Sequence, residues 1–150
     1  MPAQINYRDN NMEYKKYRNF IALRLDKGDD IAESIFTVVK TEQIKTAKVS
    51  GIGATDNFTV GVFDIAKKEY EKFDFSGNHE INAITGNITE KDGKPYIHLH
   101  ITATGKGGKV VGGHLIKGVI SLTGEIIITV IDGKILREFN DELGINRWKL

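Results

Sequence analysis

Three of the four histidines in this sequence, His98, His100 and His114, lie within 17 residues of one another. The first two belong to an alternating run whose intervening apolar residues are Ile97, Leu99 and Ile101. Side chains two residues apart on a β-strand point to the same face. We therefore expect the apolar residues to face the core and the two imidazoles to stand together on the other face. There they could bind one divalent metal ion, with zinc as the first candidate.

The third histidine, His114, follows Gly112 and Gly113. If the strands on either side of residues 104–108 pair as a hairpin, His114 comes close to His98, or to a site shared with a neighbouring subunit. Glycine has no side chain, so another group can approach the backbone closely there. Three neutral imidazoles would leave one coordination position open, as in catalytic zinc sites. The alternative is a set of hydrogen-bonded histidines on a polar sheet face or at an oligomer interface.

Residues 77–81 supply the remaining histidine, His79, and a carboxylate, Glu80. Glu80 could be a catalytic general base or a fourth metal ligand, and a solvated surface charge is the alternative. The glycine-rich residues 105–109 do not form a phosphate-binding loop, because Val110 replaces the Ser or Thr that would bind magnesium. We expect a flexible hairpin turn there instead.

The composition excludes several classes of protein. A chain of 150 residues is long enough for one domain with a substantial core. The net charge of +1 argues against a dedicated nucleic-acid domain, which usually has a pI above about 9. With no cysteine, the chain has no disulfide, thiolate chemistry or cysteine-type zinc site. No segment has the apolar character of a signal peptide or of a membrane span of ~20 residues, so we expect a cytoplasmic protein without membrane contact.

The pattern along the chain predicts an α+β domain over residues 17–150, preceded by a loosely ordered lead-in over 1–16. Residues 19–25 alternate as a strand, and Asp30 with Glu33 predicts the start of a helix that runs to about residue 43. From residue 45 onward the pattern favours strands. They are expected over 46–53, 58–66, 68–75, 80–90, 95–103, 109–121, 124–131 and 134–139.

Two Asp-Gly pairs, at residues 92–93 and 132–133, predict type I′ hairpin turns. The strands that flank each pair should therefore be antiparallel neighbours. Residues 126–131 are apolar on both faces, which predicts a strand in the middle of the sheet or against a partner subunit.

Four segments, taken together and in this order, resemble the PPC domain, the plants and prokaryotes conserved family. They are Gly51-Ile52-Gly53-Ala54, Gly77-Asn78-His79-Glu80-Ile81 with Gly86, residues 93–100, and Gly112-Gly113-His114-Leu115 followed by Gly118 and Glu125. The resemblance covers about residues 17–140. It implies a curved, mostly antiparallel β-sheet packed against one main helix, and a homotrimer.

The resemblance also bears on the ligands of the protein. His98, His100 and His114 match the prokaryotic branch of the family, whose corresponding elements look like a metal site. Plant members carry an Arg-Gly-Arg-Pro AT-hook and a Gly-Arg-Phe-Glu-Ile-Leu loop linked to partner binding. This chain has no AT-hook, and only Gly77 and residues 80–81 match that loop. Both differences weaken a DNA-binding interpretation.

Three functions stay open on this evidence. The first is a trimeric, non-enzymatic binding protein with a histidine metal site, associated with DNA or with a protein partner in regulation. The second is a metal-dependent enzyme that acts on a small molecule at the three histidines, with Glu80 as the base. The third is a structural trimer without an ion. We favour the first, because no residue beyond Glu80 is placed for chemistry.

Overall fold

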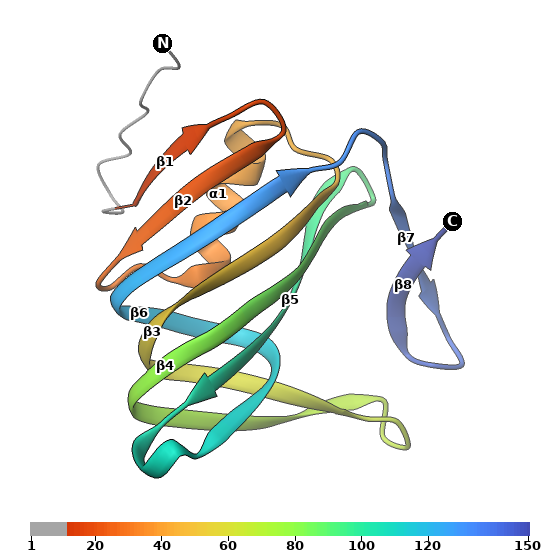
Figure 1. Cartoon of the computed structure of the whole chain (residues 1–150). Helices are drawn as coiled ribbons and strands as arrows, with labels where there is room; N and C mark the ends of the chain where they lie inside the picture. Colours follow the sequence, from red (N-terminus) through yellow and green to blue (C-terminus); the bar gives the residue numbers. More distant parts are fainter. Residues whose placement is uncertain (1–11) are drawn as a thin grey trace.

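The structure is a computed structural model that describes residues 12–150. The elements, in chain order, are β1 (Glu13–Lys16), β2 (Phe20–Asp26), α1 (Ile31–Thr41), β3 (Ala47–Asp64), β4 (Glu69–Lys91), β5 (Lys94–Thr104), a short 3₁₀ turn η1 (Lys106–Gly108), β6 (Val110–Val130), β7 (Leu136–Asn140) and β8 (Ile145–Lys149). One strongly curved sheet dominates the molecule, with α1 on one side and the β7–β8 hairpin set apart on the other (Figure 1). The expected curved sheet with one main helix is confirmed.

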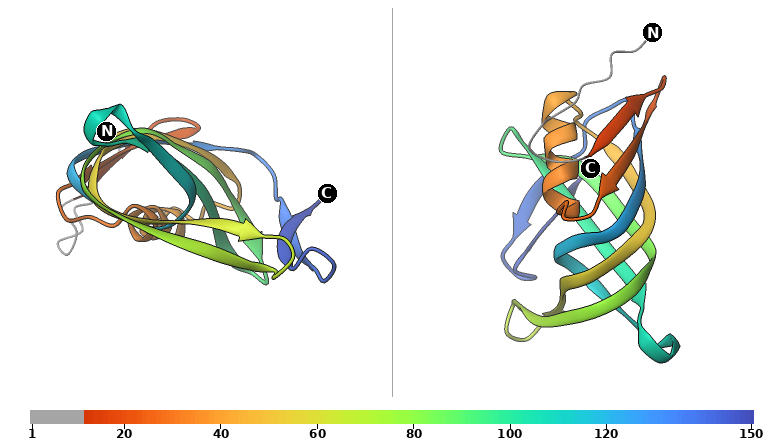
Figure 2. Two further views of the ribbon diagram at one scale, coloured as in Figure 1. Left: turned by 90° about the horizontal axis from the view of Figure 1, so that it is seen from below. Right: turned by 90° about the vertical axis from the view of Figure 1, so that its left-hand side faces the viewer.

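The sheet closes partly on itself. Its strands follow the order β1-β2-β6-β3-β4-β7-β8, and β5 pairs with both β4 and β6. Because β3 also pairs with β4 and with β6, the strands β3 to β6 form a closed ring (Figure 2). All pairs are antiparallel except the single contact between Glu90 of β4 and Leu136 of β7.

Helix α1 begins as the sequence predicts. The Asp30 carboxylate accepts a hydrogen bond from the Glu33 backbone N–H at 2.9 Å, which caps the first turn. The apolar stripe of the helix is fully buried against β5 and β6, and its members are Ile31, Ile35, Val38 and Val39. These residues join the inward-facing strand residues in one core.

The long strands are continuous where the sequence predicted interruptions. The predicted strands 46–53 and 58–66 form one strand, β3. Likewise, 68–75 and 80–90 join in β4, and 109–121 and 124–131 join in β6. In β3 the register shifts between Gly51 and Gly53 and again between Thr55 and Asn57. Such bulges bend a strand without breaking its ladder, so the polar and glycine residues that resembled turns are bends instead.

The two Asp-Gly pairs behave differently. Asp92 and Gly93 have φ angles of 52° and 76° and join β4 to β5 in the predicted hairpin. The prediction for residues 132–133 was wrong, because β7 pairs with β4 and β8 and not with β6. Both edges of that end of β6 are already occupied by β2 and β3, so β6 has no free edge for a further strand. The central position predicted for residues 126–131 is thereby confirmed.

Some residues of the expected lead-in belong to the described fold. Residues 13–16 form β1, which pairs with β2, and Met12 and Tyr14 are buried. The rest of the expected lead-in lies outside the described residues. At the other end β8 adds a strand that the sequence pattern did not reveal. Over residues 12–150 no helix has the length and apolar character of a membrane span, and the cytoplasmic location remains a prediction.

Candidate metal centre

The three histidines meet on one face of β5 and β6. His100 and His114 are direct partners across the two strands, and His98 lies two residues before His100 on β5. One ring nitrogen of each lies within 4.8 Å of the others. On the opposite side of β5, Leu99 and Ile101 are buried in the core. The predicted shared orientation of His98 and His100, and the approach of His114, are both present in the structure.

Glycines allow the strands to bring these histidines together. Gly86 of β4 lies against the backbone of β5, and a Cβ at that position would overlap the carbonyl oxygen of His98. Gly112 lies in the same way against the carbonyl oxygen of Ile101. The close approach expected beside His114 is therefore made by the neighbouring backbone of β5.

An aromatic ring supports the third histidine. Tyr70 of β4 stacks on His114 with ring centroids 4.6 Å apart and an angle of 24° between the planes. Gly61, the partner of His114 on β3, leaves room for that ring, since a Cβ there would lie 2.7 Å from Cδ1 of Tyr70. The stacking fixes the plane of the His114 imidazole.

Arg137 connects the cluster to the C-terminal hairpin. Its guanidinium donates to Thr89 Oγ1 at 2.7 Å and to Asn87 Oδ1 at 2.9 Å on β4. It also donates to the carbonyl oxygen of Asn146 on β8 at 3.1 Å and lies 4.4 Å from the centre of the Tyr96 ring. One buried cation thus holds the β7–β8 hairpin against β4 beside the histidines.

Burial favours the neutral form of two of the imidazoles, His98 and His114. Burial lowers the pKa of His98 to about 4, with smaller contributions in the same direction from His114, Arg137 and His100. Burial, and next His100, also lowers the pKa of His114. A neutral imidazole is the form that binds a metal ion, because the protonated ring has no free lone pair.

The donor set fits a divalent ion. The His114 Nδ1 atom is buried and has no hydrogen-bond partner among residues 12–150. Such orphaned atoms are rare in folded proteins, and an ion bound through Nδ1 would satisfy this one. Imidazole nitrogen is a usual ligand of zinc, with copper, nickel and iron as alternatives. The three histidines could therefore hold a metal ion.

A comparison with known protein families assigns the chain. The model of the Plants and Prokaryotes Conserved domain matches residues 12–132. The chain belongs to this family. The comparison with curated proteins found no match to this PPC protein.

Solved structures of similar proteins agree with this family. A candidate DNA-binding protein from Bacteroides thetaiotaomicron is 28% identical, with a TM-score of 0.89 over 92% of this chain and 96% of that chain. A metal-containing protein from Archaeoglobus fulgidus is 31% identical, with a TM-score of 0.81 over 93% and 98%. A plant- and prokaryote-conserved protein from Pyrococcus horikoshii is 30% identical, with a TM-score of 0.81 over 91% and 94%.

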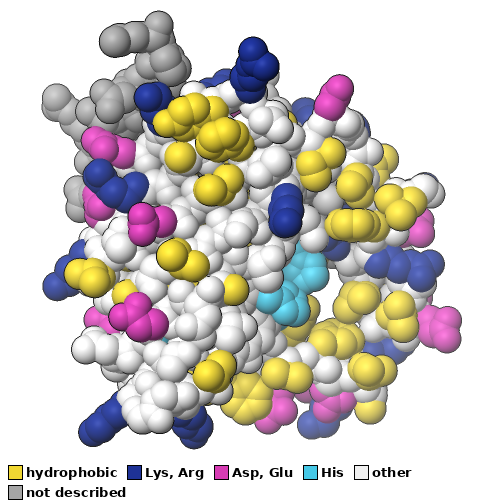
Figure 3. All heavy atoms as spheres, in the orientation of Figure 1, with side chains coloured by type: hydrophobic (Ala, Val, Ile, Leu, Met, Phe, Trp, Pro, Cys, Tyr) yellow, Lys and Arg dark blue, Asp and Glu magenta, His cyan; other side chains and the backbone are white. Residues whose placement is uncertain are grey.

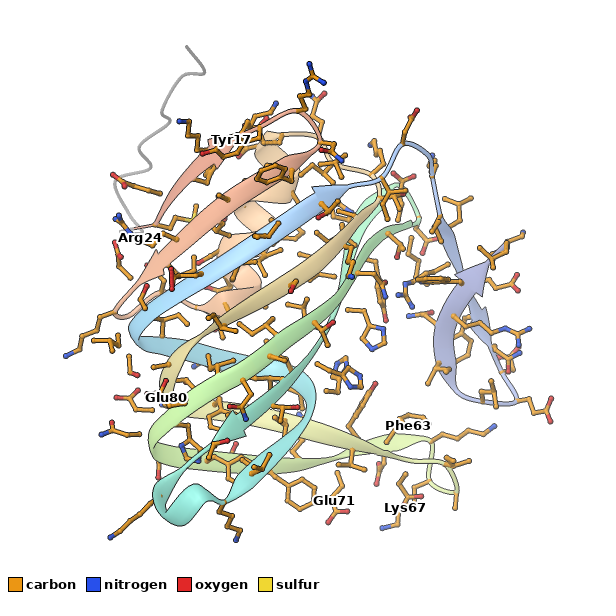
Figure 4. The ribbon with its side chains drawn as sticks, viewed as in Figure 1. Tyr17, Arg24, Phe63, Lys67, Glu71 and Glu80 are labelled. Carbon is orange, nitrogen blue, oxygen red and sulfur yellow. The ribbon has the colours of Figure 1, made fainter. Side chains whose placement is uncertain are left out.

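In this PPC protein Glu80, the remaining predicted site residue, and its neighbour His79 lie elsewhere. Glu80 is exposed where β4 bends, five residues before Thr85, the partner of His100 (Figure 4). Five residues of extended strand span about 16 Å, so Glu80 does not reach the histidines of its own chain. His79 packs edge-on against Phe58 at 5.0 Å, and its Nδ1 is 2.7 Å from the carbonyl oxygen of Gly77. Within residues 12–150 the candidate metal-binding group consists of the three histidines alone.

The residues that surround the cluster were missed by sequence reasoning. Tyr70 and Arg137 lie 44 residues before and 23 residues after His114, and neither belongs to a motif. Tyr96 was visible beside His98, but only the structure reveals its contact with Arg137. Alternation within one strand predicts a shared face, whereas these contacts depend on how distant strands pair.

Proposed function

We propose that this PPC protein is a metal-binding protein in which His98, His100 and His114 together hold one divalent ion, with zinc as the first candidate. The observation that carries the proposal is the approach of three imidazole nitrogens to within 4.8 Å on one sheet face. The lowered pKa values of His98 and His114 and the orphaned Nδ1 of His114 support it. The description of the Archaeoglobus fulgidus relative as metal-containing also supports it.

We favour a binding role over catalysis. A hydrolytic metal site needs a base close to the ion, and Glu80, which the sequence suggested, lies far along β4. Among residues 12–150 no carboxylate belongs to the metal-binding group. The ion would then stabilise the junction of β4, β5 and β6 and offer its open position to a ligand.

We further propose that the chain forms a homotrimer, as its resemblance to the PPC family implies. Ile52 on β3 and Ile127 on β6 are 54% and 49% exposed although their strands lie inside the sheet. Both line a shallow hollow on the outer face of the sheet. Burial of this face against another copy would remove apolar surface from water. Sedimentation equilibrium should give three times the mass of the chain.

A role in DNA association, or in the regulation of a protein partner, is the second candidate. Its support is the description of two relatives, from Bacteroides thetaiotaomicron and Ralstonia eutropha, as candidate DNA-binding proteins. Binding through phosphates should weaken steeply as salt rises, because neutralised phosphates release counterions. An absence of duplex binding even at low salt would exclude the DNA role and leave the metal site unaffected.

Elemental analysis tests the metal proposal. The purified protein should carry about one ion for each chain, and His100→Ala should carry much less, because removal of one of three ligands weakens the site severely. The matched control is His79→Ala, which removes a histidine outside the cluster. Equal metal content in His100→Ala and the unmodified protein would refute the proposal.

A further inference from the structure

A pocket of about 260 Å³ is lined by two of the three histidines, His98 and His114. Its walls come from three parts of the chain, represented by Phe63 and Tyr70 of the β3–β4 hairpin, His98 and His114 of the cluster, and Phe139 and Asn146 of the β7–β8 hairpin. In Figure 3 the visible histidine side chains lie at the rim of a hollow bordered by apolar side chains. Figure 4 shows Phe63 on the side of the molecule that carries the C-terminal hairpin.

The hairpin that closes this pocket is held in place. Arg137 joins β7 to Asn87 and Thr89 of β4 and to the backbone of Asn146 on β8. The family model ends at residue 132, so this wall comes from a segment beyond the matched domain. A preformed pocket beside an ion is the usual setting of a small-molecule site.

Two buried polar atoms without partners belong to residues that line this pocket. They are His114 Nδ1 and Asn146 Oδ1, and the only other such atom in the described chain is Ser34 Oγ in α1. An ion bound through His114 Nδ1 would satisfy the histidine nitrogen. The Asn146 oxygen is an acceptor, and a rotation of its amide toward the pocket would let it accept from an N–H or O–H group of a ligand.

We propose that the pocket binds a small planar aromatic carboxylate that carries a hydroxyl or amino group. This inference rests on the proposed metal site. The carboxylate would bind the ion, whose two positive charges attract it, while the opposite charges of Lys68 and Glu69 in the pocket lining offset each other. The ring would lie among Phe63, Tyr70 and Phe139, and the hydroxyl or amino group would donate to Asn146 Oδ1. At about 30 Å³ for each water-sized group, the volume accommodates roughly nine non-hydrogen atoms, close to the size of a hydroxybenzoate.

The test uses full-length protein loaded with cobalt(II), whose visible spectrum reports the surroundings of the ion. The stoichiometry of cobalt binding is measured first, and 4-hydroxybenzoate, benzoate and acetate are then titrated. We expect the spectrum to shift with 4-hydroxybenzoate at concentrations at least tenfold lower than with acetate. Benzoate should fall between the two, because it fills the ring site but cannot donate to Asn146.

Three variants separate the parts of the proposal. Phe139→Ala should weaken binding of 4-hydroxybenzoate about tenfold with unchanged cobalt stoichiometry, and its matched control is Leu143→Ala on the same hairpin. Phe139 is 55% exposed, so its substitution should not disturb folding. Asn146→Ala should abolish the preference for 4-hydroxybenzoate over benzoate.

The outcomes distinguish the two proposals. Failure to bind cobalt would overturn both the metal site and the ligand. Stoichiometric cobalt whose spectrum responds equally to 4-hydroxybenzoate and acetate would overturn the ligand proposal alone. The ligand proposal would also be overturned if Phe139→Ala leaves probe binding unchanged. It would be overturned as well if the protein binds no probe and Phe139→Ala dissociates an oligomer, because a second copy of the chain would then occupy the pocket.

Discussion

His100 of β5 and His114 of β6 are direct partners across two antiparallel strands, with ring centroids 5.7 Å apart. His98 reaches the same face because it precedes His100 by two residues, and its ring lies 5.2 Å from each of the other two. The cluster is therefore a product of strand register. If the register of β5 against β6 slipped by one residue, the histidine side chains of one of the two strands would point toward the core.

Gly86 should control the position of His98. In Gly86→Val the new side chain would collide with the carbonyl oxygen of His98 and push β5 away from β4. We expect at least a tenfold loss of zinc affinity, measured by competition with a chromogenic chelator, together with a lower melting temperature.

The matched control is Gly51→Val on β3. A Cβ there would lie 2.9 Å from Cγ1 of Ile126, and Gly51 is separated from β5 by strand β4. This variant should also melt at a lower temperature, but the folded protein should retain its zinc affinity. Equal affinity losses in the two variants would show that Gly86 has no specific effect on the site.

Metal retention should extend to acidic pH. The pKa of His98 is lowered to about 4, and that of His114 is lowered from 6.5, mainly through burial. A proton competes with the ion only as the pH falls toward the pKa of the ligand. We expect the protein to retain zinc after dialysis at pH 5.5 and to release it as the pH approaches 4. Release centred at pH 6.5 or above would contradict the lowered pKa values.

Glu90 should stabilise the connection between β4 and two loops, the one before β3 and the one before β7. Its buried carboxylate lies 2.8 Å from Lys134 Nζ and 3.4 Å from Lys45 Nζ. The hydrogen bond from Lys134 is the main cause that lowers the pKa of Glu90 below its ordinary 4.5. Glu90→Gln should therefore lower the melting temperature at pH 7.

The effect of Glu90→Gln should depend on pH. A carboxylate with a lowered pKa contributes stability that is complete above its unfolded pKa and is lost as the pH falls through the folded value. The difference between Glu90→Gln and the unmodified protein should thus shrink below about pH 4. Glu138→Gln, which alters an exposed pair 4.0 Å from Arg147, should have little effect at either pH.

The N-cap of α1 offers a test of the fold away from the site. Asp30→Ala removes the acceptor of the Glu33 N–H and should cost about 1 kcal/mol of unfolding free energy. In a domain of this size that corresponds to roughly 2–4 °C in calorimetry. Asp30→Asn retains an acceptor and should melt close to the unmodified protein. A larger loss in Asp30→Asn would show that the negative charge matters more than the cap.

Local patterns in the sequence account for a large part of the site. Alternation with Leu99 and Ile101 predicts that His98 and His100 share a face, and the hairpin around residues 104–108 predicts the return of His114. The Asp30 cap and the hairpin at residues 92–93 are likewise decided by neighbouring residues. These predictions hold because each depends on the conformation of one short segment.

The remaining features depend on long-range competition between strands. The turn at residues 132–133 failed as a hairpin because β2 and β3 already occupy the edges of β6. The stacking of Tyr70 on His114 depends on the pairing of β3 with both β4 and β6. Neither relation leaves a periodic signal in the sequence.

X-ray absorption of the zinc-loaded protein tests the central claim most directly, because multiple scattering from imidazole rings counts the histidine ligands of the ion. His98, His100 and His114 should give three imidazoles for each zinc, and His114→Ala should give two or lose the ion altogether. Zinc bound by one imidazole or none, or an unchanged spectrum in His114→Ala, would contradict the claim that these three residues form one metal site.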